Sequence, residues 1–184
     1  TAFGKQNDCP RPNILVSENV INLVSKKFQN IYKKMGLIPV DASLTDRNID
    51  KNVIPVKYLI AKIVHKKCSL FIFPEGNNSI YKDKTLEEKF QPGVAKIIKH
   101  ILDSKDSVKV VPLGLSYHNV KNNMGSIHIG DTITLRKIDD NIYYIKDAET
   151  PELMGKSGTR KSTRNIIKLL CSKLEDSVTL SKLE

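Results

Sequence analysis

The sequence predicts an α/β fold in which a mixed, mainly parallel sheet is flanked by helices. Short apolar runs, typical of buried strands, alternate along the chain with segments whose apolar residues recur every three or four positions, as on one face of a helix. That alternation favours helices packed in layers on a sheet. No linker rich in Gly, Pro or Ser interrupts the chain, so we expect a single domain over residues 1–184, with an irregular start at 1–12.

The first half of the chain carries two helical patterns between three apolar runs. The first pattern extends from Val20 to Met35, and Gly36 is a suitable residue to end that helix. In chain order we expect a strand at 13–17, a helix at 18–35, a strand at 37–40, a polar loop at 41–51, a helix around 56–64 and a strand at 68–73.

The second half begins with a polar segment and ends with a basic one. Val108 to Leu115 is a long apolar run, which is typical of a strand at the centre of a sheet. In chain order we expect a rim or surface loop at 77–89, a helix at 94–102, a strand at 108–115, strands at 126–129 and 132–135, an unassigned polar region at 139–158, and a closing segment at 156–184 made of a basic stretch and a helix around 166–174.

The composition favours some classes of binding partner over others. Thirty Lys and Arg residues against 20 Asp and Glu give a net charge of +10, which favours anionic partners, although solvated helix faces explain the same charge equally well. We expect no nucleic-acid partner, because the basic residues lack the aromatic motifs, zinc-finger spacing or glycine loops of such domains. The three cysteines are widely spaced and predict reduced thiols, without a metal site.

Residues 70–79, Leu-Phe-Ile-Phe-Pro-Glu-Gly-Asn-Asn-Ser, are the most informative segment. The four apolar residues predict a strand buried on both faces, and Pro74 ends it. Glu75 then falls on a turn closed by Gly76, just beyond the carboxyl end of the strand, where open α/β sheets bind their ligands. An ordinary surface turn is the alternative interpretation of the same pattern.

Four sequence blocks, in order over residues 13–135, resemble those of the glycerolipid acyltransferases, the family of 1-acyl-glycerol-3-phosphate acyltransferase. Phe73 to Ser79 is similar to that family's Phe-Pro-Glu-Gly-Thr-Arg-Ser block. The other three are Met35 to Asp41, similar to Gly-x-Ile-Pro-Val-Asp-Arg; Phe90 to Ala95, similar to Phe-Lys-x-Gly-Ala; and Val110 to Gly114, similar to Val-Pro-Val.

The resemblance implies a fold, an activity and a site. It implies transfer of a fatty acyl group from acyl-CoA or acyl-carrier protein, as co-substrate, to a lysophosphatidate-like hydroxyl, with no further cofactor. It places the acceptor side of the site at the strand ends. The residues that it assigns to substrate binding are Glu75, Gly76, Asn78, Ser79 and Asp41.

The chain also departs from the family pattern. The family's general base is the His of a His-x-x-x-x-Asp pair, and imidazole suits that task because it titrates near neutrality. The four histidines here are each followed, five positions on, by a residue other than Asp, so no catalytic residue is assigned in this chain. Ala42 and Asn78 stand where the family has arginines that hold a phosphate, which leaves the identity of the acceptor open.

Two expectations follow for the whole protein. The family's catalytic pair precedes the Met35–Asp41 block, so we expect the chain to lack the N-terminal part of the domain and to be inactive by itself. We also expect peripheral attachment to the cytoplasmic side of an anionic membrane, since basic clusters contribute about 1 kcal/mol per Lys or Arg near such a surface. A non-catalytic remnant that binds lipid or acyl carrier is the alternative function.

Overall fold

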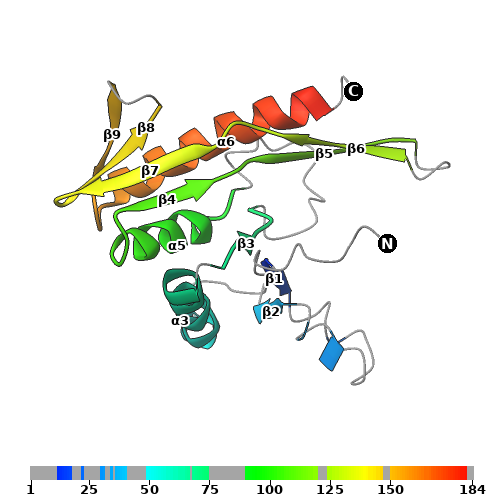
Figure 1. Ribbon diagram of the computed structural model, residues 1–184, viewed down its shortest axis with the longest axis horizontal. Coiled ribbons are helices and arrows are strands. Elements are labelled where there is room, and N and C mark those ends of the chain that lie inside the picture. The colour runs from blue at the N-terminus through cyan, green and yellow to red at the C-terminus, as the bar shows by residue number, and fades with distance from the viewer. Residues whose placement is uncertain are drawn as a thin grey trace. The chain divides into compact units, whose positions relative to one another are not determined.

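The computed structural model describes residues 12–17, 22, 30–31, 34, 36–40, 49–66, 68–74, 90–119, 124–146 and 150–181. By its internal contacts the chain divides into two compact units, residues 1–78 and 79–184. The described residues form helices with one parallel sheet and two antiparallel ones (Figure 1), which confirms the mixed α/β class. The single domain over residues 1–184 stays a prediction.

The first unit is built on a small parallel sheet. Strand β1 (Asn13–Ser17) lies between β2 (Leu37–Val40) and β3 (Leu70–Phe71), and both neighbours run parallel to it. Helix α3 (Ile49–Lys66) precedes β3 and is longer than the pattern around 56–64 predicted. The strands at 13–17 and 37–40 are confirmed, whereas the third is shorter than the predicted 68–73.

Gly36 provides the turn into β2. Residues 22, 30, 31 and 34 are helical, as predicted, and the rest of that helix lies outside the described residues. Gly36 has φ +90°, a backbone conformation that favours glycine, and a Cβ there would lie 2.9 Å from the carbonyl oxygen of Pro12. Its own carbonyl accepts a 3.0 Å hydrogen bond from the backbone N–H of Ile14. The close approach of β1 to this turn therefore requires glycine.

The second unit is antiparallel. Strands β4 (Ser107–Val110), β7 (Ile133–Ile138), β8 (Asn141–Ile145) and β9 (Pro151–Lys156) form one sheet in that order. Strands β5 (Leu113–Asn119) and β6 (Met124–Ile129) form a separate two-stranded ribbon. The helices among the described residues of this unit are α5 (Gly93–Leu102) and α6 (Arg160–Ser181).

The core of the second unit lies between its helices and the four-stranded sheet. Residues of β7 alternate between buried and more exposed positions, so that Ile133 and Leu135 face the core. Helices α5 and α6 contribute apolar side chains to the same cluster. Its buried members are Phe90, Ala95, Ile98, Leu102, Ile133, Leu135, Ile142, Met154, Ile166, Leu170 and Cys171.

Helix α6 continues beyond the sheet and lies against the β5–β6 ribbon (Figure 1). Gly114 on β5 and Gly130, just after β6, allow this close approach: a Cβ on Gly114 would overlap the carbonyl of Ser177, and one on Gly130 would overlap its hydroxyl oxygen. The opposite, apolar face of the ribbon is more open, with Ile127 and Ile129 exposed.

Three sequence predictions for this unit were wrong or incomplete. The run at 108–115 is not one central strand: it divides at Val111-Pro112 into β4, at an edge of one sheet, and β5 in another. Pro112 has no N–H to donate, and its carbonyl instead accepts from Gly130 N–H. The region 139–158, left unassigned, contains β8 and β9. Because six of the strands described pair antiparallel, the sheets are not mainly parallel.

Candidate functional site

The edge of the parallel sheet is the candidate site predicted by the sequence. In a parallel sheet all carboxyl ends point to the same edge. Val40, the last residue of β2, pairs with Ser17, the last residue of β1. Phe71, the last residue of β3, pairs with Ile14, three positions before Ser17. The chain therefore leaves β2 at Val40 and β3 at Phe71 on either side of β1 and in the same direction.

At the amino ends of the strands, Asn13 holds β1, β3 and α3 together. Its side chain is 2% exposed. The Nδ2 group and the backbone N–H both donate to the carbonyl of Ser69, at 3.3 and 2.8 Å, and so fix the start of β3 beside β1. The Oδ1 atom accepts a 3.0 Å hydrogen bond from Nζ of Lys62 on α3. Lys62 Nζ also lies 5.6 Å from the ring centroid of Tyr58.

The five predicted substrate-binding residues, Asp41, Glu75, Gly76, Asn78 and Ser79, lie outside the described residues. Before Glu75 the structure describes Phe71 to Pro74. The rings of Phe71 and Phe73 meet edge to face, with centroids 5.2 Å apart. Phe73 is 59% exposed, so the expectation of a strand buried on both faces up to this residue was wrong.

Two of the four resemblance blocks lie in the second unit, where their residues pack. Phe90 is buried in the core, and Pro92 precedes the first turn of α5. Ala95 is fully buried one turn later. Pro112 and Gly114 form the passage from β4 to β5, and Gly114 lies against α6. These residues therefore have structural reasons to be what they are, whatever the chemistry of the protein.

The histidine side chains that the structure describes do not form a catalytic pair in a cleft. His65 is exposed on α3, and His128 is half-buried on β6. His100 Nδ1 lies 3.9 Å from Asp103 Oδ2, but the two side chains are 67% and 49% exposed at the end of α5. Within the described residues, no group of three or more His, Cys, Asp or Glu side chains could hold a metal ion.

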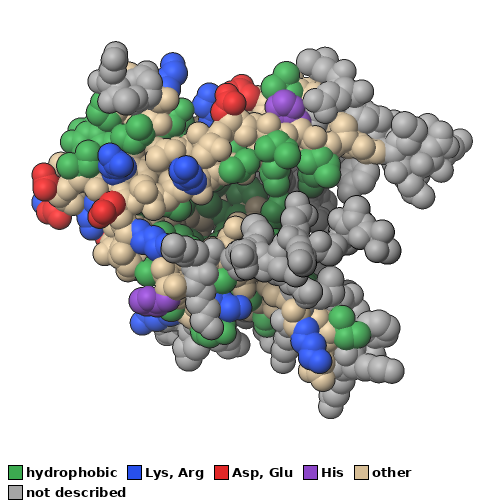
Figure 2. Space-filling model, in the orientation of Figure 1, with side chains coloured by type: hydrophobic (Ala, Val, Ile, Leu, Met, Phe, Trp, Pro, Cys, Tyr) green, Lys and Arg blue, Asp and Glu red, His purple; other side chains and the backbone are tan. Residues whose placement is uncertain are grey.

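The predicted basic stretch at 156–164 divides between a strand, a turn and the first turn of α6. Lys156 lies 3.6 Å from Asp140 in an exposed ion pair. Thr159 caps α6: its Oγ1 accepts from the backbone N–H of Ser162 at 3.2 Å. On the face shown in Figure 2, basic side chains of the second unit are separated from one another and mixed with acidic ones.

Lys99 connects the two helices of the second unit. Its Nζ donates to the carbonyl of Thr159 at 3.1 Å and to Oγ1 of Thr163 at 3.0 Å. Burial lowers the pKa of Lys99 below its ordinary value; Asp103 opposes that shift, and the like charge of Lys96 adds to it. The amino-terminal turn of α6 is thus held to α5 by a lysine that the fold partly desolvates.

Comparisons with protein families, with curated proteins and with solved structures found no match for this chain. Among the helices described, none is both long enough and apolar enough to cross a bilayer.

Proposed function

We propose that this chain is the acceptor side of a glycerolipid acyltransferase, which transfers a fatty acyl group from acyl-CoA or acyl-carrier protein to a lysophosphatidate-like hydroxyl. The observation that carries the proposal is the register of the parallel sheet. Asp41, the last residue of one block, comes directly after β2 in sequence, the block that contains Glu75 comes after β3, and both strands pair in parallel with β1. Asp41 and Glu75, which are 34 positions apart in sequence, therefore come after two strands that have the same direction and flank the same partner.

The residue types in these two blocks suit an acceptor site. A carboxylate such as Glu75 accepts hydrogen bonds from the hydroxyls of the acceptor, and the backbone of Gly76 can approach a ligand closely. Asn78 and Ser79 supply a neutral amide and a hydroxyl. A general base must remove the proton of the attacking hydroxyl, and none of the four histidines of this chain stands in a His-x-x-x-x-Asp pair.

The proposal includes a peripheral site of action at an anionic membrane. The net charge of +10 supports it. Salt screens attraction between exposed charges and an anionic surface, so this attachment should be salt-sensitive. A fold of the glycerolipid acyltransferase type, with the substrate site at the strand ends, is part of the same proposal.

A non-catalytic protein that binds lipid or acyl carrier is the second candidate, favoured by the lack of the histidine pair. The genomic DNA upstream of the Thr1 codon separates the two. An in-frame His-x-x-x-x-Asp sequence supports the enzyme, and a stop codon without such a pair supports the binding protein.

The decisive assay is thiol release from acyl-CoA in the presence of lysophosphatidate. We expect no turnover above blank for this chain, and turnover for the longer protein that includes the pair. In that longer protein, Glu75→Ala should lower kcat/KM. The expected decrease corresponds to a loss of about 1.5–3 kcal/mol of transition-state stabilisation. Glu87→Ala, in the charged segment that follows, is the matched control. Equal and mild effects at both positions would reduce the Phe-Pro-Glu-Gly segment to a surface turn.

A further inference from the structure

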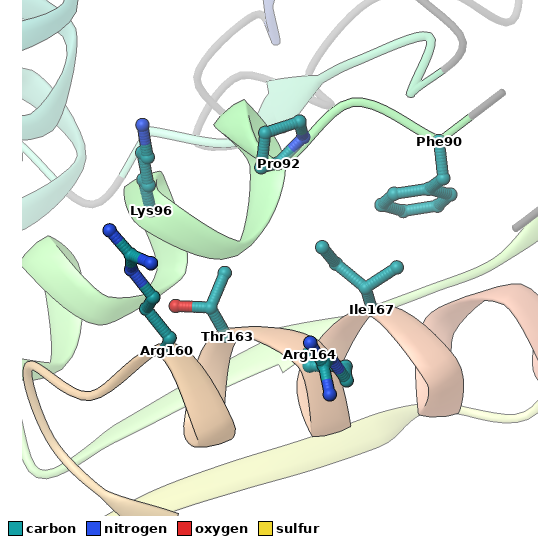
Figure 3. A pocket seen from close by; sticks show the side chains of 7 residues that line it. All are labelled: Phe90, Pro92, Lys96, Arg160, Thr163, Arg164 and Ile167. Carbon is teal, nitrogen blue, oxygen red and sulfur yellow. The ribbon is translucent and has the colours of Figure 1, made fainter. Parts of the chain in front are cut away.

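A cavity of about 380 Å³ lies between the first turns of α5 and α6 in the second unit. Its walls come from the segment that enters α5 and from two turns of α6. Figure 3 shows the charged ends of Lys96 and Arg160 on one side and the side chains of Phe90 and Ile167 on the other. Pro92, Thr163 and Arg164 complete the lining.

The charges in this cavity all have the same sign. Lys96, Arg160 and Arg164 line it, and none of the lining residues that the structure describes is a carboxylate. Across the described residues, the ion pairs of the second unit use His100, Lys137, Lys156 and Lys173 rather than these three cations. All three residues are exposed, so solvent screens part of their mutual repulsion, and an anion in the cavity would reduce what remains.

The two helices add to the same positive potential. The amino-terminal turns of α5 and α6 both border the cavity, and neither contains an acidic residue. Helix amino termini favour negative charge, so Arg160 and Lys161 in the first turn of α6 oppose the usual preference. At α5, Pro92 offers no side-chain cap. The first turns of α5 and α6 contain no negative charge, and an anionic ligand in the cavity would supply one.

The rest of the lining is apolar, which distinguishes this cavity from a simple anion site. The ring of Phe90 is 6% exposed and lies on the same side of the cavity as Ile167 (Figure 3). Inorganic phosphate would leave this wall in contact with water, whereas an apolar substituent would cover it. The volume is near the lower end for small-molecule sites, so the substituent is short or only part of it enters.

We propose that this cavity binds an amphipathic phosphate ester, with the phosphate against Lys96, Arg160 and Arg164 and the apolar substituent against Phe90, Pro92 and Ile167. Arginine suits the phosphate because its planar guanidinium donates two parallel hydrogen bonds. The proposal goes beyond acyl transfer and does not rest on it, because binding is measured in the absence of any reaction.

The test is calorimetric titration of the full chain with hexyl phosphate, inorganic phosphate and hexanol at low ionic strength. We expect hexyl phosphate to bind with 1:1 stoichiometry and at least about tenfold more tightly than either of the others. Binding of hexyl phosphate no tighter than that of inorganic phosphate would overturn the proposal, because the apolar wall would then contribute nothing.

Substitutions of lining residues test whether hexyl phosphate binds in the cavity. Arg160→Gln and Arg164→Gln should each weaken hexyl phosphate binding about tenfold. Lys161→Gln is the matched control: it removes the same charge from the same turn of α6, and Lys161 is exposed, as Arg160 and Arg164 are, but does not line the cavity. Equal losses for Arg160→Gln and Lys161→Gln would overturn the proposal in favour of attraction by net charge. Ile167→Ser should weaken hexyl phosphate binding and leave inorganic phosphate unchanged, and a change in both would count against the assigned orientation.

Competition distinguishes the sources of such an ester. Dihexanoyl phosphatidate, below its micelle concentration, represents a lipid headgroup, and coenzyme A represents a phosphorylated carrier. Displacement of hexyl phosphate by one and not by the other supports the proposal and identifies the source. Displacement by neither would overturn it, since the cavity would then exclude the esters that cells contain.

Discussion

The backbone carbonyl of Ser177, on α6, occupies the space that a Cβ atom on Gly114, in β5, would need. The contact is between two backbones, so no side-chain rotation can relieve it. The Ser177 hydroxyl donates a 3.0 Å hydrogen bond to the carbonyl of Lys173 and lies at the position that a Cβ on Gly130 would take. Small residues on the ribbon thus allow α6 to lie directly on it.

Gly114→Ala should therefore destabilise the second unit by about 1–3 kcal/mol, because β5 and α6 must move apart. Gly93→Ala is the control. Gly93 begins α5, and a Cβ there meets nothing within 4 Å. Alanine also favours the helix, so this variant should be neutral or stabilising by about 0.4–1 kcal/mol. Urea unfolding followed by circular dichroism measures both, and equal free energies of unfolding would contradict the close approach of α6.

Two isoleucines on strands of the second unit should respond very differently to truncation. Ile133 on β7 is 1% exposed, and Ile127 on β6 is 64% exposed. We expect Ile133→Ala to cost about 2–5 kcal/mol, through lost burial and the cavity left behind. Ile127→Ala should cost less than about 1 kcal/mol, mainly through strand propensity. A large cost at Ile127, measured in dilute solution, would mean that the exposed face of the ribbon is covered.

Substitution of Lys62 tests how much its hydrogen bond to Asn13 contributes to stability. In Lys62→Met the buried Oδ1 of Asn13 loses its partner, at an expected cost of about 1–3 kcal/mol. Lys57→Met, on the exposed side of the same helix, should change the free energy of unfolding by less than about 0.5 kcal/mol. Amide hydrogen exchange of β1 and β3 residues locates the effect, and unchanged protection in Lys62→Met would show that the bond contributes little.

Lys99 should make stability depend on pH in the alkaline range. Because its pKa is lower in the folded protein than its ordinary value of 10.5, the unfolded chain binds more protons between those two values. The free energy of unfolding of the wild type should therefore rise, relative to Lys99→Met, as the pH rises through that window. Chemical unfolding from pH 8 to 10.5 measures the difference. A relative decrease would mean that Asp103, rather than burial, controls the lysine.

Binding of the chain to anionic membranes should depend on the salt concentration. We expect the chain to co-sediment with phosphatidylglycerol vesicles and not with phosphatidylcholine vesicles, because the net charge of +10 is the only attraction proposed. Screening acts over about 10 Å at 0.1 M salt, so binding should decrease steeply as salt is added. Binding that resists salt, or that is equal on neutral vesicles, would instead indicate apolar contact with the membrane.

Periodicity and apolar runs were sufficient to predict the elements that pack on one face. The helix at α5 and the strands β1 and β2 followed from the sequence, because burial of side chains such as Ala95 and Ile98 requires the spacing that they show. The same reasoning joined β4 to β5. Apolarity alone does not distinguish one long strand from two that enter different sheets, and Pro112 in the middle of the run was the available signal.

The region of β8 and β9 was missed because its turn is made by acidic residues rather than by glycine. Asp139 and Asp140 form the two-residue connection from β7 to β8, and Asp139 has φ +52°. Aspartate tolerates this conformation better than most residues, so Ile-Asp-Asp-Asn was a readable hairpin signal. The cavity was beyond prediction: Lys96 is separated from Arg160 by 64 positions, and Arg160 and Arg164 were assigned to a basic stretch before the closing helix, whereas α6 begins at Arg160.

The two kinds of sheet imply different folding rates. Strands β7, β8 and β9 pair with neighbours next along the chain, and such local pairings close small loops and form early. The bond from Asn13 to Ser69 must close a loop of 56 residues before β3 can join β1. The unit that the ribosome makes first is thus the one whose sheet depends on the more distant partners. Protection of its strands in a refolding experiment should appear after that of the hairpins downstream.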